Sequence, residues 1–328
     1  MNTSIKYGMT LSSEEHAPRR LVELATMAEG HGFDFVSVSD HYHPWVDEQG
    51  HSPFVWSVLG AVAQATSQLE IAVGVTCPIM RIHPAVLAQA TATTALLAEG
   101  RFTWGVGTGE ALNEHILGDR WPPADLRHDM LEEAVAVVRQ LWTGEQVTHR
   151  GTHFTVENAR IYDPPEPAPP VVVSAFGPAA AKVAGKIGDG LWVSGPSTDT
   201  IEQWKDAGGS GPVYAQLTLC WAEDRDDAVK TAHRIWPNNG VPGQLSQDLP
   251  TPAHFEQASG VVTEEQIAES VPCGPDPEPV LSSIEEMLDA GIDHVYLHQI
   301  GPDQEGFCRF WSERIVPGLR GRKASAEG

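Results

Sequence analysis

The sequence has 328 residues, of which 41% are hydrophobic, and carries a formal net charge of −23. A surface this acidic repels nucleic acids and anionic membranes, and no basic stripe offsets it, so neither is expected as a partner. The N-terminus lacks an apolar segment of signal-peptide length, and no later stretch is long enough to span a membrane, which predicts a cytoplasmic protein. The four cysteines are scattered and are interpreted as free thiols, and no histidine spacing indicates a metal site.

Short apolar runs typical of buried strands alternate with segments of helical periodicity along most of the chain. In chain order, the first half predicts a strand over 5–11, a helix over 18–31, a strand over 33–39, a helix over 53–67, a strand over 69–75, a helix over 84–97, a strand over 102–106 and a helix over 126–142. The second half predicts strands over 171–175, 190–194, 213–221 and 294–299, helices over 178–187 and 279–290, and a last helix that ends near Pro317, followed by a frayed tail over 321–328.

Two segments do not fit the alternation and are predicted as insertions. The first lies near 147–170, where a hairpin-like pattern with a turn at Arg150 and Gly151 is followed by a proline-rich stretch. The second lies near 236–260, is rich in Pro, Gly, Asn and Gln, and is expected to cover one end of the fold as a lid.

About eight apolar strands that alternate with helices favour a closed parallel barrel over an open sheet. We therefore predict an α/β protein, a single (β/α)8 TIM barrel over residues 1–328 with these two inserted segments. In such barrels the chemistry lies at the C-terminal ends of the strands, so the residues that follow each strand are the candidate site.

Two residues after different strands are expected to converge at that end of the barrel. His41 follows the second strand, with Asp40 before it and Trp45 after it, and Glu110 follows the fourth strand in a glycine-rich loop. A histidine and a carboxylate beside an indole can transfer a proton next to a flat ligand. The alternatives are that His41 is a surface histidine and that Trp45 only covers the rim.

The sequence has neither a Ser-His-Asp nucleophile elbow nor a Walker loop, which disfavours hydrolysis and phosphoryl transfer.

Three motifs then carry a resemblance to a known family. SDHYHPW over 39–45, TCPIMRIHPAVLAQATAT over 76–93 and GVGTGEALNE over 105–114 resemble the luciferase-like superfamily, and within it the branch that uses the deazaflavin coenzyme F420. That branch includes F420-dependent glucose-6-phosphate dehydrogenases and a secondary alcohol dehydrogenase. The resemblance runs from Tyr7 to about Gly195 and returns at 289–298, and it implies a barrel with F420 across its C-terminal mouth.

The resemblance also implies roles for individual residues. It places Asp40 and His41 next to the deazaflavin and the substrate, with His41 handling the proton of the substrate hydroxyl. Trp45 shields the developing charge, and Glu110 is the proton partner near the ring. The further coenzyme contacts that it implies are Cys77, Thr108, Gly109, Asn113, a non-proline cis peptide at Gly74–Val75, and the helix start at Phe176 and Gly177, whose free N–H groups suit a phosphate. Lys182 and Lys186 would lie within reach of an acidic coenzyme tail, or else on a solvated helix face.

One departure from the family pattern bears on the substrate. The sugar-phosphate dehydrogenases hold a phosphate with basic side chains in stretches that correspond here to 193–199, 237–250 and 264–271, and these contain no lysine or arginine. A dianionic phosphate without such a clamp would bind poorly. We therefore expect an uncharged alcohol, ketone or imine rather than glucose 6-phosphate, in a pocket that includes Glu14, Val193 and Trp236, with Trp192 and Trp221 as further walls.

Three alternatives remain open from the sequence. The chain could be an FMN-dependent monooxygenase of the same superfamily, a sugar-phosphate dehydrogenase with an altered phosphate site, or a deazaflavin-binding protein without catalysis. Analogy with barrels of this family predicts a homodimer.

Overall fold

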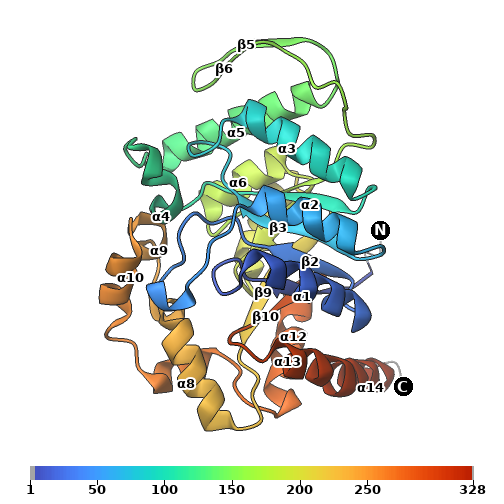
Figure 1. The fold of residues 1–328 in the computed structure, drawn as a ribbon, viewed down its shortest axis with the longest axis vertical. Helices are drawn as coiled ribbons and strands as arrows, with labels where there is room; N and C mark the ends of the chain where they lie inside the picture. Colours follow the sequence, from blue (N-terminus) through green and yellow to red (C-terminus); the bar gives the residue numbers. More distant parts are fainter. Residues whose placement is uncertain (1–3, 327–328) are drawn as a thin grey trace.

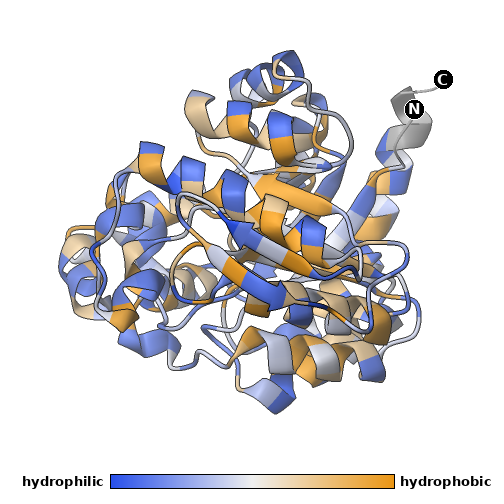
Figure 2. Ribbon diagram, turned by 90° about the horizontal axis from the view of Figure 1, so that it is seen from above, coloured by the Kyte–Doolittle hydropathy of each residue, from blue (hydrophilic) through white to orange (hydrophobic). Residues whose placement is uncertain are grey.

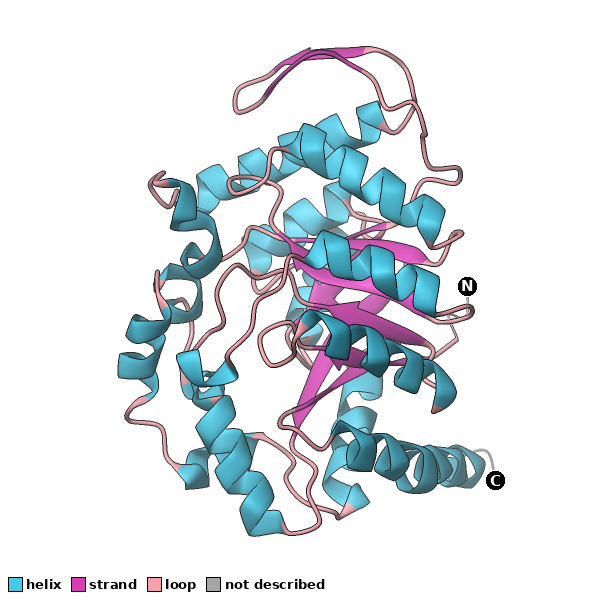
Figure 3. Cartoon of the chain, in the orientation of Figure 1, coloured by secondary structure: helices cyan, strands magenta, loops and turns pink. Residues whose placement is uncertain are grey.

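The computed structural model describes residues 4–326 and shows a closed barrel of parallel strands wrapped by helices (Figure 1, Figure 3). Each barrel strand pairs with its neighbours in chain order, and the last strand closes onto the first. The predicted (β/α)8 fold is therefore confirmed. The eight strands of the barrel are β1 (Lys6–Leu11), β2 (Phe35–Val38), β3 (Glu70–Thr76), β4 (Phe102–Val106), β7 (Val171–Ser174), β8 (Gly190–Val193), β9 (Val213–Leu219) and β10 (His294–Gln299).

Helices follow the strands and bury one face of each against the barrel. Leu21, Leu24, Ala25 and Ala28 form the buried face of α1, as their spacing requires. Figure 2 shows hydrophilic and hydrophobic residues alternating along these helices. The helices between consecutive strands are α1 (Pro18–Gly30), α2 (Val55–Ala65), α3 (Pro84–Leu97), α4 (Ala111–Glu114), α5 (Ala124–Leu141), α6 (Pro178–Ile187), α7 (Thr198–Asp206), α8 (Arg225–Ile235) and α12 (Pro277–Asp289), with short 3-10 turns at η1 (Asp47–Gln49) and η2 (His115–Leu117).

The barrel interior is filled by an aromatic layer at its middle. Trp192, Tyr214, Tyr296 and Phe35 pack together with Ala72, Val172 and Val75, and the Trp192 indole donates to the Tyr296 hydroxyl at 2.7 Å. Successive residues of a strand point to opposite faces, so the neighbours of these residues face the helices instead. The interior above this layer opens toward the C-terminal ends of the strands.

The two segments predicted as insertions contribute no strand to the barrel. The first contains β5 (Val147–Arg150) and β6 (Thr155–Ala159), an antiparallel pair outside the barrel, at the top of Figure 1. Glu133 of α5 holds its turn by accepting from the backbone N–H groups of Thr152, His153 and Phe154. The second insertion is helical, with η3 (Pro237–Gly240), α9 (Leu245–Asp248) and α10 (Pro252–Ser259), and α11 (Glu264–Ser270) follows it.

The structure corrects the expected C-terminus. A last helix ending near Pro317 was predicted, but α13 (Gln304–Phe310) leads through a π-helical turn (Trp311–Ile315) into α14 (Val316–Ala326). Pro317 is the second residue of α14, and a π-turn is a common way for a helix to accommodate an irregularity of this kind. Most of the tail predicted to fray is thus helical, and residues 327–328 lie outside the described residues.

No described helix combines the length and apolar character needed to cross a bilayer. Over residues 4–326, no group of three or more His, Cys, Asp or Glu side chains is arranged to hold a metal ion.

Candidate active site at the barrel mouth

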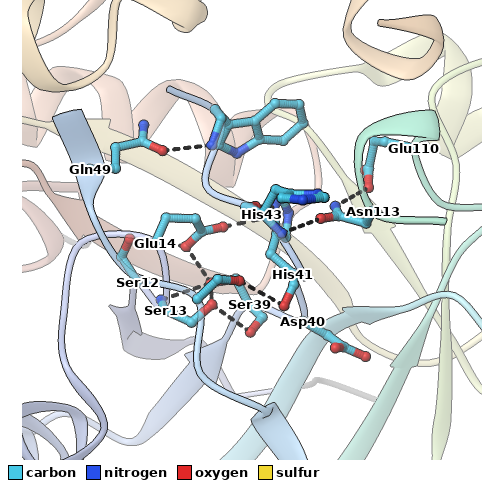
Figure 4. Close-up of polar contacts among 12 residues, drawn as sticks. Ser12, Ser13, Glu14, Ser39, Asp40, His41, His43, Gln49, Glu110 and Asn113 are labelled. Carbon is cyan, nitrogen blue, oxygen red and sulfur yellow. Dashed lines mark hydrogen bonds and ion pairs between the residues drawn. The ribbon is translucent and has the colours of Figure 1, made fainter. Parts of the chain in front are cut away.

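The loop after β2 places His41 at the C-terminal mouth (Figure 4). Its Nδ1 lies 3.2 Å from the backbone oxygen of His43, and its Nε2 lies 3.5 Å from Oε1 of Glu14. The Trp45 ring packs against the imidazole with 5.0 Å between ring centroids. The His41 side chain is 10% exposed, so it is nearly enclosed yet reachable from the mouth. The structure thus brings His41 and Trp45 together as expected.

Glu14 lies beneath His41 and is held by two hydroxyl groups. Its Oε2 accepts from Ser39 at 2.6 Å and from Ser12 at 3.1 Å, and its side chain is 2% exposed. It was expected in the substrate pocket. In the structure its nearly buried carboxylate faces the imidazole, and the two hydroxyl groups supply the donors that a buried carboxylate needs.

Asn113 joins the loop after β2 to the loop after β4. Its Oδ1 accepts from the backbone N–H groups of Tyr42 at 2.9 Å and His43 at 3.2 Å, and its Nδ2 donates to Glu110 at 3.4 Å. Figure 4 shows Asn113 between His43 and Glu110. Glu110 therefore lies in the same mouth as His41. Asn113 was expected as a coenzyme contact, and the hydrogen bonds that it makes here hold the two loops together.

Behind this mouth lies a buried ionic cluster that sequence reasoning missed in part. Arg81 donates to Oδ1 of Asp40 at 2.8 Å, and its Nε lies 3.4 Å from Glu114. Burial alone would lower the pKa of Arg81, but the charges of Asp40 and Glu114 raise it. Burial raises the pKa of Glu114 to about 7, although Arg81 acts in the opposite direction. The other oxygen of Asp40, Oδ2, is buried without a hydrogen-bond partner among the described residues.

The expected non-proline cis peptide is present at Gly74–Val75, at the mouth end of β3. Val75 is partly exposed there, above the aromatic layer of the barrel. A Cβ on Gly74 would overlap the hydroxyl of Ser37 and the ring of Trp192, so only glycine fits at this position. Gly74 and Val75 thus form the inner end of the mouth, which we call its floor.

The loop after β4 approaches the same floor. Gly109 has φ of +71°, and a Cβ there would lie 2.5 Å from Sγ of Cys77. Cys77 is buried, and burial raises the pKa of its thiol, so it packs as a neutral group. Thr108 is partly exposed, and the buried guanidinium of Arg127 lies 3.5 Å from its hydroxyl and 3.4 Å from the Gly109 oxygen.

The third expected coenzyme region is the start of α6. Gly177 precedes Pro178, the first residue of the helix, and Phe176 before it is 60% exposed. The N–H groups at such a helix start can bind an anion. Lys182 is exposed, whereas Lys186 forms an ion pair with Glu132 of α5, so the two lysines differ in what they can offer a ligand.

The expected substrate walls separate into two groups. Trp236 is buried over the mouth, where its ring lies against His298 and its indole donates to Glu15 at 2.5 Å. Val193 does not reach the mouth: its strand neighbour Trp192 faces the barrel interior, so Val193 faces the helices. Two further residues that were predicted as pocket walls do not line the mouth either. Trp192 lies in the aromatic layer, and Trp221 packs against Phe310 on the outside of the barrel.

Sequence reasoning also missed a second Glu–His pair across the mouth. Glu15 accepts from His298 of β10 at 2.8 Å and from the backbone N–H of Gly301 at 2.9 Å. Burial would raise the pKa of Glu15, but the hydrogen bond and charge of His298 lower it below its ordinary value. The adjacent residues Glu14 and Glu15 thus hold one histidine each. Only the consecutive glutamates after the first strand gave a signal for this pair.

Comparison with known proteins identifies the family. The model of the luciferase-like monooxygenase family matches residues 1–294. The chain belongs to this family. Among its luciferase-like relatives, an F420-dependent glucose-6-phosphate dehydrogenase of Rhodococcus jostii (strain RHA1) is 36% identical over 97% of this chain and 99% of its own length. The corresponding protein of Segniliparus rotundus is 37% identical over 98% of this chain and 99% of its own length.

A solved structure of the luciferase-like fold is also similar over nearly the whole chain. It is an F420-dependent secondary alcohol dehydrogenase in complex with an F420–acetone adduct, with 33% identity, a TM-score of 0.88, and coverage of 95% of this chain and 98% of its own. The relatives named for F420 therefore include two named for a sugar phosphate and one named for an alcohol.

Proposed function

We propose that this protein is an oxidoreductase that uses coenzyme F420 and transfers a hydride between the coenzyme and the carbinol or carbonyl carbon of a small uncharged substrate. The observation that carries the proposal is the enclosed His41 between Glu14 and Trp45, with Glu110 in the same mouth. The full-length similarity to proteins named as F420-dependent supports the same coenzyme.

The residues at the mouth fit a flat deazaflavin with an acidic tail. The cis peptide at Gly74–Val75 and the close approach of Gly109 to Cys77 leave room for a ring against the floor. Asp40 offers a buried oxygen that lacks a partner in the described chain, and such an atom calls for a ligand donor. Thr108, Asn113 and the helix start at Phe176 and Gly177 would hold the remainder. When bound, the coenzyme supplies the carbon that accepts or donates the hydride.

His41 has the hydrogen-bond pattern of a general base. A carbonyl oxygen can only accept, so Nδ1 carries the hydrogen that is directed at the His43 oxygen. Nε2 then has a free lone pair that can take the proton of a substrate hydroxyl. The carboxylate of Glu14, 3.5 Å away, stabilises the imidazolium that this transfer creates. The ring of Trp45 covers the pair and excludes water from it.

Glu110 is the second proton-handling group in the proposal. It is partly exposed in the mouth, and Asn113 orients its carboxylate by donating to Oε2. It can therefore hold or release a proton on the coenzyme side of the site, while His41 serves the substrate side.

An uncharged substrate follows from the absence of a cation clamp. The segments at the end of β8, in η3 and α9, and in α11 contain no lysine or arginine. Arg81 is already engaged by Asp40 and Glu114, and Arg127 is buried against Thr108 and Gly109. The carboxylates at the mouth would repel a phosphate rather than bind it. We therefore favour an alcohol, ketone or imine over glucose 6-phosphate, although relatives are named for that sugar phosphate.

Anaerobic titration of the purified protein with F420, and in parallel with FMN, tests the coenzyme. We expect micromolar or tighter F420 binding and no FMN binding. FMN binding without an F420 response would contradict the proposal and favour an oxygen-dependent monooxygenase. Tight F420 binding without turnover on any alcohol, ketone or imine would instead favour a deazaflavin-binding protein.

His41→Ala tests the chemistry. Loss of a general base lowers turnover by about 10²- to 10⁴-fold, while F420 affinity should stay within a few-fold because His41 is assigned to the substrate. Steady-state kinetics and the F420 dissociation constant are measured on the same preparation. Turnover that survives this substitution would show that the assigned role of His41 is wrong.

A further inference from the structure

Three interior side chains at the mouth lie in the half of the barrel formed by β1, β9 and β10. Gln216 and Thr218 alternate with buried Leu217 and Leu219 on β9, and Thr10 lies between buried Met9 and Leu11 on β1. Because Tyr214, two residues before Gln216, belongs to the interior aromatic layer, Gln216 and Thr218 also face inward, closer to the mouth. Gln216 and Thr218 lie across the barrel from the β3 and β4 ends assigned to the coenzyme, whereas Thr10 lies beside β2.

These three residues line open space rather than packed core. Thr10, Gln216 and Thr218 are each partly exposed, although their strands are interior to the fold and their outward-facing neighbours are fully buried. Interior positions of a barrel can be exposed only where the interior is unfilled. The barrel interior is therefore accessible to solvent at these three positions.

A chain of hydrogen bonds fixes the orientation of the Gln216 amide. Its Nε2 donates to the Thr218 hydroxyl at 3.1 Å and faces Nδ1 of His298 at 3.5 Å, and its Oε1 faces the Thr10 hydroxyl at 3.4 Å. His298 directs its Nε2 hydrogen at Glu15, and in the neutral imidazole Nδ1 is then an acceptor for the Gln216 amide. The amide of Gln216 is thus held with Nε2 toward His298 and Thr218.

This fixed network leaves specific groups available to a ligand. The Thr218 hydroxyl accepts from Gln216, and no acceptor for its own hydrogen is found within residues 4–326. Gln216 Oε1 has a second lone pair beside the one that faces Thr10. This part of the interior therefore offers one neutral donor and one neutral acceptor, and the neighbouring His298 is paired with Glu15. An uncharged oxygen function matches this set, whereas a phosphate does not.

We infer that Thr218 and Gln216 bind a second oxygen of the substrate, so that the preferred substrates are diols, hydroxyketones or unphosphorylated sugars rather than simple secondary alcohols. This inference rests on the proposed function, because it places the reacting carbon next to His41. It then assigns the remote end of the same molecule to β9, beneath the Trp236 ring that covers His298.

The experiment compares hexane-2,5-diol with hexan-2-ol, which differ by one hydroxyl remote from the reacting carbon. Binding to the F420-loaded protein is followed by saturation-transfer NMR, and turnover is followed by loss of F420 absorbance. For the wild type we expect at least a tenfold preference for the diol in both binding and kcat/KM. Thr218→Val should reduce that preference about tenfold, which is the usual effect of one lost neutral hydrogen bond, and Thr218→Ser should retain it.

The control is Thr26→Val, which removes a hydroxyl from the exposed face of α1, and it should leave the preference unchanged. Equal binding of the two alcohols by the wild type, or a preference that survives Thr218→Val, would overturn the inference. Diol-selective binding without turnover would support the inference while counting against the proposed chemistry, so the two failures are distinguishable.

Discussion

At the scale of single residues, the cluster of Asp40, Arg81 and Glu114 shows how burial sets charge. One guanidinium faces two carboxylates, and all three side chains are at least nine-tenths buried. A second full negative charge in such a place is costly, so the cluster is most stable with one proton retained. The raised pKa of Glu114, about 7, identifies the carboxyl that retains it.

This pKa predicts a pH dependence of stability. The pKa of Glu114 rises from 4.5 in the unfolded chain to about 7 in the folded one. As pH increases from 4.5 to 7, the folded state keeps a proton that the unfolded state has lost, so stability falls over that window, by up to about 3 kcal/mol at about 1.4 kcal/mol per pKa unit. Glu114→Gln removes this contribution and should gain stability relative to the wild type as pH rises from 5 to 8.

Urea denaturation at pH 5, 6, 7 and 8 measures the effect. The quantity of interest is the difference in unfolding free energy between Glu114→Gln and the wild type at each pH, because any constant cost of losing the Arg81 contact cancels in the trend. Glu202→Gln, at an exposed carboxylate, is the control and should show no trend. A difference that is flat across this range for Glu114→Gln would refute the assignment.

At the scale of elements, the helical insertion is tied to the loop after β2 through one buried side chain. Gln49 accepts from the Trp45 backbone N–H at 2.8 Å, and its Nε2 donates to the Ile235 oxygen at the end of α8 at 3.0 Å and to Oδ1 of Asn238 in η3 at 3.3 Å. Phe255 of α10 adds an edge contact to the Trp45 ring, with centroids 5.0 Å apart. The insertion therefore positions Trp45 over His41 while it carries Trp236 over the other half of the mouth.

Gln49→Leu tests this connection. It leaves a buried N–H and a buried carbonyl oxygen without partners, so we expect a loss of about 1–3 kcal/mol in unfolding free energy. Because the proposal places Trp45 and Trp236 over the substrate and away from the coenzyme contacts, KM for the substrate should rise several-fold while the F420 dissociation constant changes little. Gln146→Leu on the exposed hairpin is the matched control. A comparable loss of F420 affinity would contradict the proposal that the substrate and the coenzyme occupy separate halves of the mouth.

The elements also show what the sequence could and could not predict. All eight barrel strands lie at predicted positions, because each is a short apolar run that the fold buries. Helices α7 and α8 were not predicted, since polar residues dominate both, although Ala228, Ala232 and Ile235 carry the helical spacing of α8. The second insertion was expected only as a lid, and its short helices depend on packing against the mouth.

Within the site, the sequence predicted the residues that lie in motifs but not the buried residues that pair with them. His41, Glu110 and Trp45 lie in recognisable segments, and the structure places them at one mouth. Arg81 meets Asp40 from 41 positions away, and Glu15 meets His298 from 283 positions away. No local pattern marks such pairs, because the need to neutralise a buried charge arises only when the barrel closes.

At the scale of the whole molecule, two adjacent helices differ from the rest of this acidic chain. The 11 residues of α2 and the 14 residues of α3 contain no charged side chain. Their outer face exposes large apolar residues, including Val86 at 57% and Leu97 at 39%, with Phe54 before α2 at 56%. In a chain of net charge −23, such a face is best explained as a surface that another copy of the protein covers.

We therefore predict a homodimer through α2 and α3. A symmetric interface uses the same patch on both subunits, so each substitution acts twice, and Val86→Glu combined with Leu97→Glu places four like charges in it. Light scattering coupled to size-exclusion chromatography at micromolar concentration should show a dimer for the wild type and a monomer for the double variant. The control is Val261→Glu, at an apolar residue that is 80% exposed and far in the sequence from α2 and α3. This variant should remain dimeric. A monomeric wild type, or a double variant that stays dimeric, would show that the uncharged face of α2 and α3 is not the dimer interface.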